Sequence, residues 1–163
     1  MTNMYKLVDE NDPLLRKILP LITSFDETLV GVAEKMKETM LSHDGLGLAA
    51  PQVGLALCMF IMRIQGDIIA CVNPDIISSE NEIVCEESCL SFPNLTLKVK
   101  RADRITGSFL TIKGEPVTTI FEGVDARCFQ HELDHLNGIT FDKKVSKLVL
   151  TMAKKKRQKQ RSI

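Results

Sequence analysis

A five-residue stretch of this chain, His131-Glu132-Leu133-Asp134-His135, has the pattern H-E-x-x-H. On an α-helix, residues four apart lie on one face, so His131 and His135 would direct two imidazoles at one point. Two neutral imidazoles can hold a divalent metal ion, and Glu132 beside that point can take a proton from the metal's water. The stretch therefore predicts two metal ligands and a general base.

The residues around this stretch predict a helix that is mostly buried. Apolar side chains would cover two of its faces, and Asn137-Gly138 supplies a typical stop signal just beyond it. Burying His131, Glu132 and His135 without partners would be costly, which favours a metal site over a chance match on a surface helix. Two ligands do not complete such a site, so a third must come from another part of the chain.

Length and composition indicate one globular domain. The chain has 163 residues, of which 44% are hydrophobic and 26% are charged, which is typical of soluble proteins with a real core. We expect residues 1–163 to form a single domain, with a basic helix or tail over about residues 146–163. No apolar run approaches the ~20 residues that span a bilayer, and the first ten residues lack an apolar signal segment. We therefore expect a cytoplasmic protein with no membrane partner.

Cysteine is present in an odd number, five, at Cys58, Cys71, Cys85, Cys89 and Cys128. No secretion signal accompanies these residues, so a disulfide framework is not expected and reduced thiols are available as metal ligands. No C-x-x-C pair occurs, which excludes a four-cysteine zinc ribbon.

Charge is distributed unevenly, although the net charge is zero. After Asp142 the chain has nine Lys and Arg residues and no acid, whereas residues 1–142 have twelve bases and twenty-one acids. This asymmetry predicts that the basic tail meets an anionic partner.

The pattern of apolar residues predicts helices on either side of a group of strands. Ser24 and Glu27 form a capping-box pattern before a helix expected from about Asp26 to Ser42, with His43 as an exposed residue at its end. The strands predicted by alternation and turn residues are Leu55–Ile64, Asp67–Val72, Glu82–Cys85, Leu95–Val99, Arg104–Ile112 and Glu115–Phe121. This order predicts an α+β fold in which antiparallel or mixed sheets pack around a central metal-binding helix.

Two further stretches accompany H-E-x-x-H. Residues 45–52 read G-L-G-L-A-A-P-Q, and residues 87–91 read E-S-C-L-S. The first lacks the third glycine of a dinucleotide fingerprint and the lysine of a P-loop, which makes nucleotide binding a poor interpretation. Together, in this order, the three stretches closely resemble the motifs GφGφAAxQ, EGCLS and HExxH (φ apolar) of the peptide deformylase family, metallohydrolases that remove the N-formyl group from new polypeptides.

The resemblance implies a complete metal site. Cys89, His131 and His135 would be the protein ligands of one divalent metal ion, and the fourth position would be open to water or hydroxide. The family commonly uses Fe²⁺ natively, and Zn²⁺, Ni²⁺ or Co²⁺ can occupy the same site. A ligand set of one sulfur and two nitrogens suits all four metals, so the sequence does not separate them.

The resemblance also implies the roles of three catalytic groups. Water or hydroxide on the metal would attack the formyl carbon, with Glu132 as general base and then as the acid that protonates the leaving amine. The side-chain amide of Gln52 and the backbone N–H of Leu90 would donate hydrogen bonds to the oxyanion that forms. The products would be formate and a peptide with a free N-terminal methionine.

The resemblance places a further set of residues around the N-formylmethionyl nascent peptide: Leu46, Gly47, Cys85, Glu87, Ser88, Arg127 and Cys128. Leu46, Gly47 and the backbone near Ser88 would line a groove to which an extended peptide adds as a strand. Ser88 departs from the usual glycine of the family, and its Cβ could narrow the approach of the substrate backbone. Glu87 either pairs with Arg101 in support of the site, or the two are unrelated surface charges.

Two other functions compete with deformylation. A zinc endopeptidase of the H-E-x-x-H type would need a third His or Glu ligand downstream, but no His follows His135 and no Glu follows Glu132; only Asp142 remains. A non-enzymatic RNA-binding or ribosome-binding protein would use the basic tail, but this function leaves the three motifs unexplained.

The basic tail is predicted to be helical from near Ser146. Val145, Leu148, Val149 and Met152 recur at near-helical spacing and are expected to pack on the body, while the end of the helix projects basic residues. The resemblance implies that this helix docks on the ribosome near the nascent-chain exit. The alternative is a frayed, solvated terminus.

Overall fold

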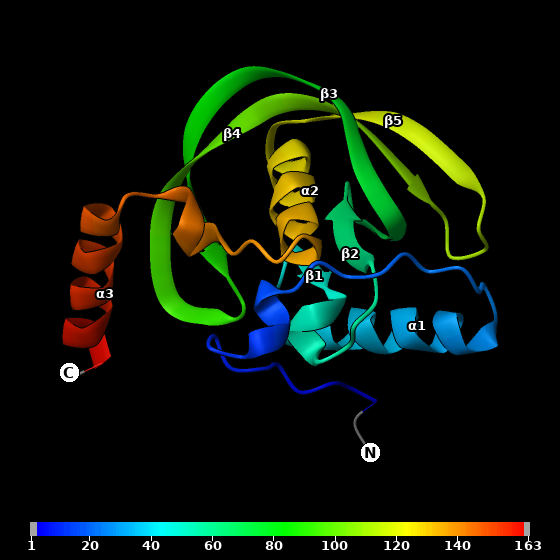
Figure 1. Cartoon of the computed structure of the whole chain (residues 1–163), viewed down its shortest axis with the longest axis horizontal. Helices are drawn as coiled ribbons and strands as arrows, with labels where there is room; N and C mark the ends of the chain where they lie inside the picture. Colours follow the sequence, from blue (N-terminus) through cyan, green and yellow to red (C-terminus); the bar gives the residue numbers. More distant parts are fainter. Residues whose placement is uncertain (1–2, 162–163) are drawn as a thin grey trace.

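The computed structural model describes residues 3–161. Its helical elements are η1 (Pro13–Arg16), α1 (Glu27–Ser42), η2 (Ala50–Val53), α2 (Gly123–Leu136), η3 (Phe141–Lys144) and α3 (Lys147–Arg161), where η denotes a short 3₁₀ helix. Its strands are β1 (Gly47–Ala49), β2 (Met59–Ile64), β3 (Asp67–Cys89), β4 (Phe92–Leu110) and β5 (Pro116–Glu122), which form one antiparallel sheet in the order β1-β2-β3-β4-β5. The predicted α+β class is confirmed (Figure 1).

Strands β3 and β4 are longer than predicted. β3 runs without interruption across Asn73-Pro74, where the sequence predicts an end. The β3–β4 register shifts at this point, so the proline sits at an irregularity where it does not break the ladder. Asn73 adopts a φ of 49°, and its side chain hydrogen-bonds to the backbone of Ile22. The predicted segments 67–72 and 82–85 are therefore parts of one strand, and the predicted segments 95–99 and 104–112 both fall largely within β4.

The sheet curves around α2, which is the predicted central helix (Figure 1). Phe129 of α2 packs edge-on against Phe60 of β2, with ring centroids 5.1 Å apart, and its ring lies 4.9 Å from that of Phe121 in β5. Gly107 of β4 makes room for these rings, because a Cβ at this position would lie 2.9 Å from Phe121. These buried contacts fix α2, and hence the side chains on its other faces, relative to the sheet.

Helix α1 has the predicted bounds, but its N-terminal cap differs from the prediction. Asp26, and not Ser24, caps the helix, and its carboxylate accepts hydrogen bonds from two backbone N–H groups of the first turn. The buried face of α1 packs against β1 and β2 in an apolar cluster. His43 at the C-terminal end is exposed, as predicted.

Helix α3 forms where predicted, but it packs on the body through a different face. Leu150 and Ala153 pack against a buried apolar cluster that includes residues of β4 and η3. Leu148, Val149 and Met152, which were expected to face the body, are 70%, 44% and 62% exposed. The prediction of the packed face was therefore wrong for these three residues.

A buried ion pair also holds α3 in place. Arg157 is 9% exposed, and its Nη1 lies 3.2 Å from the carboxylate of Glu10 in the N-terminal arm. Val145, just before the helix, packs against the same apolar cluster, as predicted. The remaining Lys and Arg residues of α3 are exposed. Among residues 3–161, no helix has the length and apolar character needed to cross a membrane.

Candidate active site

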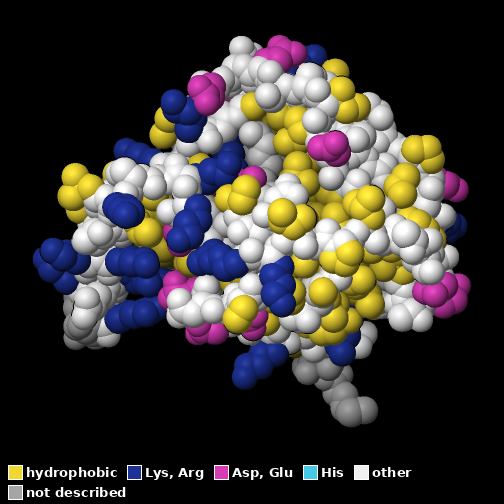
Figure 2. All heavy atoms as spheres, in the orientation of Figure 1, with side chains coloured by type: hydrophobic (Ala, Val, Ile, Leu, Met, Phe, Trp, Pro, Cys, Tyr) yellow, Lys and Arg dark blue, Asp and Glu magenta, His cyan; other side chains and the backbone are white. Residues whose placement is uncertain are grey.

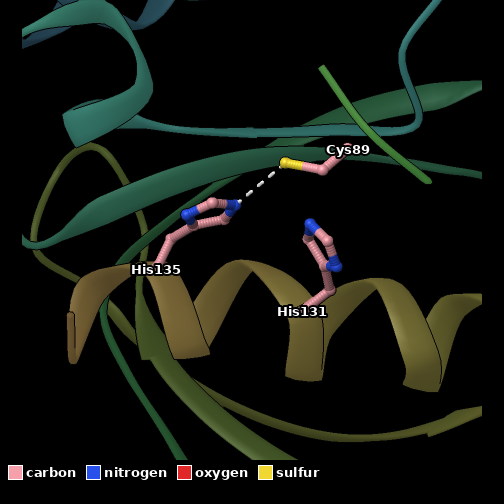
Figure 3. A group of neighbouring side chains, drawn as sticks. All are labelled: Cys89, His131 and His135. Carbon is pink, nitrogen blue, oxygen red and sulfur yellow. Dashed lines mark hydrogen bonds between the residues drawn. The ribbon is translucent and has the colours of Figure 1, made fainter. Parts of the chain in front are cut away.

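Cys89, His131 and His135 meet between the sheet and the central helix, with their side chains turned toward one another (Figure 3). Cys89 ends β3, and the two histidines lie one turn apart on α2. One ligand atom of each side chain lies within 4.8 Å of the others, and Cys89 Sγ is 3.4 Å from His135 Nε2. The structure thus brings together the three residues that the sequence predicts as metal ligands.

The geometry and chemistry of this cluster fit a divalent metal ion. A tetrahedral ion with metal–sulfur and metal–nitrogen distances of about 2.3 and 2.0 Å separates sulfur from nitrogen by roughly 3.5 Å. The 3.4 Å between Cys89 Sγ and His135 Nε2 agrees with such an edge. All three side chains are buried, and a thiolate with two imidazoles is a donor set that suits iron, zinc, cobalt and nickel.

The electrostatics of the cluster also favour a cation. Burial lowers the pKa of His135, which keeps it the neutral imidazole that metal binding requires. Burial acts in the same direction on His131, but its hydrogen bonds with Cys89 and Glu87 outweigh burial and raise its pKa. The negative charge that favours a proton on His131 would equally favour a divalent ion in the cluster.

Glu87 lies directly behind His131 and connects it to Arg101. Glu87 Oε1 is 2.9 Å from His131 Nδ1, and Arg101 Nε is 2.8 Å from Glu87 Oε2. Arg101, which is 4% exposed, also donates to Asp134 of α2 at 2.5 Å. Burial would raise the pKa of Glu87, but its bonds with His131 and Arg101 lower it to about 2. Glu87 and Arg101 are therefore a buried pair that supports the histidine, and not two unrelated surface charges.

Glu132 projects from α2 beside the cluster and is 4% exposed. Its Oε2 is buried and has no hydrogen-bond partner among the described residues. Burial raises the pKa of Glu132 to about 7. A carboxyl group with such a pKa can both accept and release a proton near neutral pH.

Gly47 of β1 leaves the space that Glu132 occupies. A Cβ at position 47 would lie 2.6 Å from Glu132 Oε1 and 2.8 Å from Cys128 Sγ. β1 therefore runs closer to α2 at this point than any residue with a side chain would allow. The small residue at position 47 therefore serves the close approach of β1 to α2.

Gln52 is buried in η2, with its side-chain amide in the site. Its Oε1 accepts a hydrogen bond from the Ala49 N–H at 2.8 Å. Its Nε2 donates to Ser91 Oγ at 3.1 Å and lies 3.5 Å from Cys89 Sγ. Because the carbonyl end is held by the backbone, the N–H₂ end is fixed toward the cluster as a donor.

A cavity of about 840 Å³ opens onto this site. Its walls include, besides His131, Glu132 and Cys89, most of the residues predicted for the substrate and the oxyanion: Leu46, Gly47, Gln52, Glu87, Ser88, Leu90, Arg127 and Cys128. Further wall residues that lie outside the three motifs include Leu7, Asn94, Thr96 and Val124. Leu7 is brought to the cavity by the N-terminal arm, and Asn94 and Thr96 by the β3–β4 hairpin, and no local pattern marks these three. Val124 lies on α2 seven residues before His131, two helical turns away, so helical spacing does mark it.

Cys85 does not join this cavity, although the sequence predicts it in the methionine pocket. It is absent from the walls among the described residues and pairs with Val99 on β4. Two residues of strand, roughly 7 Å, separate it from Glu87, which already lies behind His131. Proximity in sequence to Cys89 therefore does not carry Cys85 into the pocket.

The comparisons with known proteins agree with the motifs. The polypeptide deformylase family model matches residues 4–150. The chain belongs to this family. A peptide deformylase of Thermotoga petrophila is 42% identical over 154 residues, which cover 94% of each chain.

Solved structures of the family share the fold. A peptide deformylase from Legionella pneumophila is 39% identical and superposes with a TM-score of 0.91, covering 98% of this chain and 96% of that one. A peptide deformylase from Acinetobacter baumannii, solved with Met-Ala-Ser bound, is 32% identical with a TM-score of 0.84, covering 89% of this chain and 100% of that one.

Membership in the family decides the class of activity. Peptide deformylases are metal-dependent hydrolases that remove the N-formyl group from newly made polypeptides, and this chain is an enzyme of that class. The sequence-based prediction of the family is confirmed. The alternatives of a zinc endopeptidase and of a non-enzymatic RNA-binding protein are set aside.

Proposed function

We propose that this chain deformylates N-formylmethionyl peptides at the site formed by Cys89, His131, His135 and Glu132. The proposal rests on one observation, the convergence of three ligand atoms to within 4.8 Å beside a buried carboxyl group. Cys89, His131 and His135 would hold one divalent metal ion, with Fe²⁺ as the native ion and Zn²⁺, Ni²⁺ or Co²⁺ as substitutes. When bound, the ion supplies Lewis-acid activation of water and of the formyl carbonyl.

Glu132 moves the proton in this reaction. It takes a proton from the attacking water, whose oxygen forms the new bond to the formyl carbon, and it then protonates the nitrogen as the C–N bond breaks. A pKa of about 7 suits both steps, because the carboxyl group exists in both protonation states near neutral pH. Formate leaves, and the peptide keeps a free methionine amine.

Gln52 and Leu90 stabilise the oxyanion formed by this attack. Gln52 Nε2 is fixed toward Cys89 by the hydrogen bond that its Oε1 accepts, and the backbone N–H of Leu90 follows directly after the cysteine in the chain. Such a preorganised donor is typically worth ~3 kcal/mol of the activation barrier.

The substrate is a peptide whose first side chain enters the cavity. Leu46, Cys128 and the aliphatic stem of Arg127 would surround the methionine side chain, and the backbone near Ser88 would pair with the peptide. The related structure from Acinetobacter baumannii contains Met-Ala-Ser, a peptide of the expected product class, which supports this assignment.

We further propose that residues 1–163 act as one catalytic domain in the cytoplasm, without a membrane partner. The basic residues of α3 would attract the ribosome near the nascent-chain exit. Their exposure supports this role, because Arg157 alone among the Lys and Arg residues of α3, within the described part of the chain, is buried.

The Glu132→Gln variant tests the proposed mechanism. The amide keeps the size of the side chain but cannot act as a base, so metal-loaded Glu132→Gln should release formate from formyl-Met-Ala-Ser roughly 10²–10⁴-fold more slowly than wild type. Metal content, measured on the same sample, should be unchanged. Turnover at the wild-type rate by the metal-loaded variant would refute the role of Glu132.

The Cys89→Ala variant tests the metal site separately. It deletes the thiolate of the ligand set, so metal affinity and formate release should fall together. Unchanged metal stoichiometry and affinity would show that Cys89 is not a ligand. The Cys85→Ala variant is the matched control, because Cys85 lies on the same strand outside the cavity.

A further inference from the structure

A second groove continues the active-site cavity along the β3–β4 ribbon. It has a volume of about 470 Å³ and lies between this ribbon and the first turns of α3, which stands beside β4 (Figure 1). Glu86 of β3 and Thr96 of β4 belong to the walls of both the cavity and the groove. A chain that leaves the cavity past these two residues therefore enters the groove directly.

We propose that this groove binds the part of the formylated polypeptide that follows the residues held in the active site, and that it favours segments with acidic and apolar side chains. The inference rests on the proposed deformylation and extends it, because it assigns a sequence preference several residues beyond the formylmethionine.

The dimensions of the ribbon set the length of peptide that reaches the groove. Ser88 lines the cavity and Val84 lines the groove, and the two lie four positions apart on β3. At about 3.3 Å per residue, this separation is roughly 13 Å. A formylated tripeptide that pairs near Ser88 ends before the groove, whereas an extended octapeptide spans it.

The walls of the groove offer apolar surface from two sides. Val84 on β3 is 59% exposed and Val149 on α3 is 44% exposed, and Leu97, Val145 and Ala153 complete the apolar part of the lining. Val149 was expected to pack on the body, but the helix presents it to this groove instead. Exposed apolar side chains on facing elements mark a surface that a partner can cover.

The charges around the groove are mainly positive. Lys98, Lys100 and Lys144 contribute to its walls, against the single acid Glu86. Lys100 lies 3.8 Å from Glu82, and Lys144 lies 3.5 Å from Asp134. The Lys100–Glu82 pair is exposed, and such surface pairs are weak, so Lys100 can still interact with an acidic ligand. Asp134 is only 17% exposed, so Lys144 is held more firmly.

The wider surface reinforces this preference. Figure 2 shows Lys and Arg side chains gathered over α3 and the neighbouring part of the molecule, on the side where the groove lies. An acidic peptide segment would therefore be attracted to the groove, and a basic segment would be repelled.

Three formylated peptides test the proposal with the metal-loaded enzyme. The first is formyl-Met-Ala-Ser, and the other two are octapeptides that begin with this sequence and continue with leucines alternating with either glutamates or lysines. Formate release gives kcat and KM for each. We expect the acidic octapeptide to have the lowest KM, the basic octapeptide a higher KM, and all three a similar kcat, because the groove adds binding far from the reacting bond.

Variants of the groove give the decisive comparison. Lys98→Glu should raise the KM of the acidic octapeptide roughly three- to tenfold, as expected when one surface charge is reversed and an attraction becomes a repulsion. It should leave the KM of the tripeptide unchanged. Val84→Ser should raise the KM of the acidic octapeptide without changing kcat. Lys113→Glu, which makes the same charge change on the exposed turn between β4 and β5, should have no effect.

The outcomes separate this proposal from the proposed function. Equal KM values for the acidic and basic octapeptides in the wild type, or a preference that persists in both Lys98→Glu and Val84→Ser, would overturn the groove assignment. A tripeptide that is not deformylated would instead refute the proposed function. In that event, fluorescence anisotropy of the two labelled octapeptides on the same variants still decides whether the groove binds the acidic one.

Discussion

His131 Nδ1 lies 2.9 Å from Glu87 Oε1, and Glu87 is in turn held by Arg101 Nε at 2.8 Å. An ionised carboxylate can only accept hydrogen bonds, so Nδ1 carries a proton and its N–H donates a hydrogen bond to Glu87. In the neutral ring that binds a metal, the lone pair is then on Nε2, which is the atom available to the ion. Glu87 therefore fixes both the tautomer and the orientation of the His131 imidazole.

This relationship predicts the effect of Glu87→Ala. The variant should lower metal affinity roughly 10–100-fold, because the imidazole of His131 loses the group that orients it. Competition with a chelator measures the change. Glu86→Ala is the matched control, since Glu86 is an exposed acid on the opposite face of β3. Equal metal affinity in both variants would show that the contact with Glu87 does not support the ligand.

A second prediction concerns the packing of β1 on α2. A Cβ added at Gly47 would lie 2.6 Å from Glu132 Oε1, which requires the carboxyl group to shift. Because a misplacement of about 1 Å can cost 10²-fold in rate, Gly47→Ala should reduce kcat/KM on formyl-Met-Ala-Ser by roughly that factor. Metal content should be unchanged, because the added Cβ would meet Glu132 and Cys128 and none of the three proposed metal ligands.

The control for this prediction lies on α1. Gly31→Ala adds the same atom where nothing lies within 4 Å, so its activity should equal that of the wild type. A Gly47→Ala enzyme with wild-type kcat/KM would mean that Glu132 has room to move without loss of function.

The motif residues were predictable because their placement depends on local structure. His131, Glu132 and His135 share one helix, so a spacing of four residues is enough to bring the two imidazoles together. Cys89 was assigned through a resemblance, and the β3–β4 hairpin is what carries it to α2. The pairing of Arg101 with Glu87 was left open. In the register of β3 against β4, Arg101 lies opposite Ile83 and Glu87 opposite Leu97. The two side chains therefore meet through tertiary packing beside α2, where Arg101 also binds Asp134 and Glu87 also binds His131.

The predictions that failed depended on tertiary packing. On α3, Leu148 and Met152 form one pair at helical spacing, and Leu150 and Ala153 form another. Only the position of the apolar cluster that contains Phe141 decides which of the two pairs is buried. Asn73-Pro74 is a common strand end, but here the register irregularity accommodates it within β3. Neither the partner of a helix face nor a β-bulge can be read from one segment alone.

A third prediction concerns Ser88, which is exposed on the cavity wall where the family usually has glycine. Ser88→Gly removes the Cβ and should let the peptide backbone approach more closely. We expect KM for formyl-Met-Ala-Ser to fall by up to roughly tenfold, with kcat and metal content unchanged. Ser88→Ala keeps the Cβ and should retain the wild-type KM. A large loss of metal in Ser88→Gly would show instead that Ser88 supports the ligand Cys89.

The last prediction concerns the basic face of α3. Lys154, Lys155 and Lys159 are exposed, whereas Arg157 is buried against Glu10 and anchors the helix. Replacing the three lysines by glutamine should therefore remove charge without releasing α3 from the body. If these lysines contact ribosomal RNA, co-sedimentation with ribosomes should weaken, and the dependence of binding on salt should become shallower by up to about three counterions. Turnover of formyl-Met-Ala-Ser should be unchanged, because the lysines do not line the cavity.

A variant with the same loss of charge elsewhere separates specific docking from general attraction. Lys17, Lys37 and Lys113 lie outside α3, and their replacement by glutamine lowers the net charge by the same amount. Long-range attraction would weaken equally in both triple variants, since it depends on total charge. Docking through α3 predicts that only the first variant loses binding across the salt series, and equal binding by that variant and the wild type would refute the role of α3.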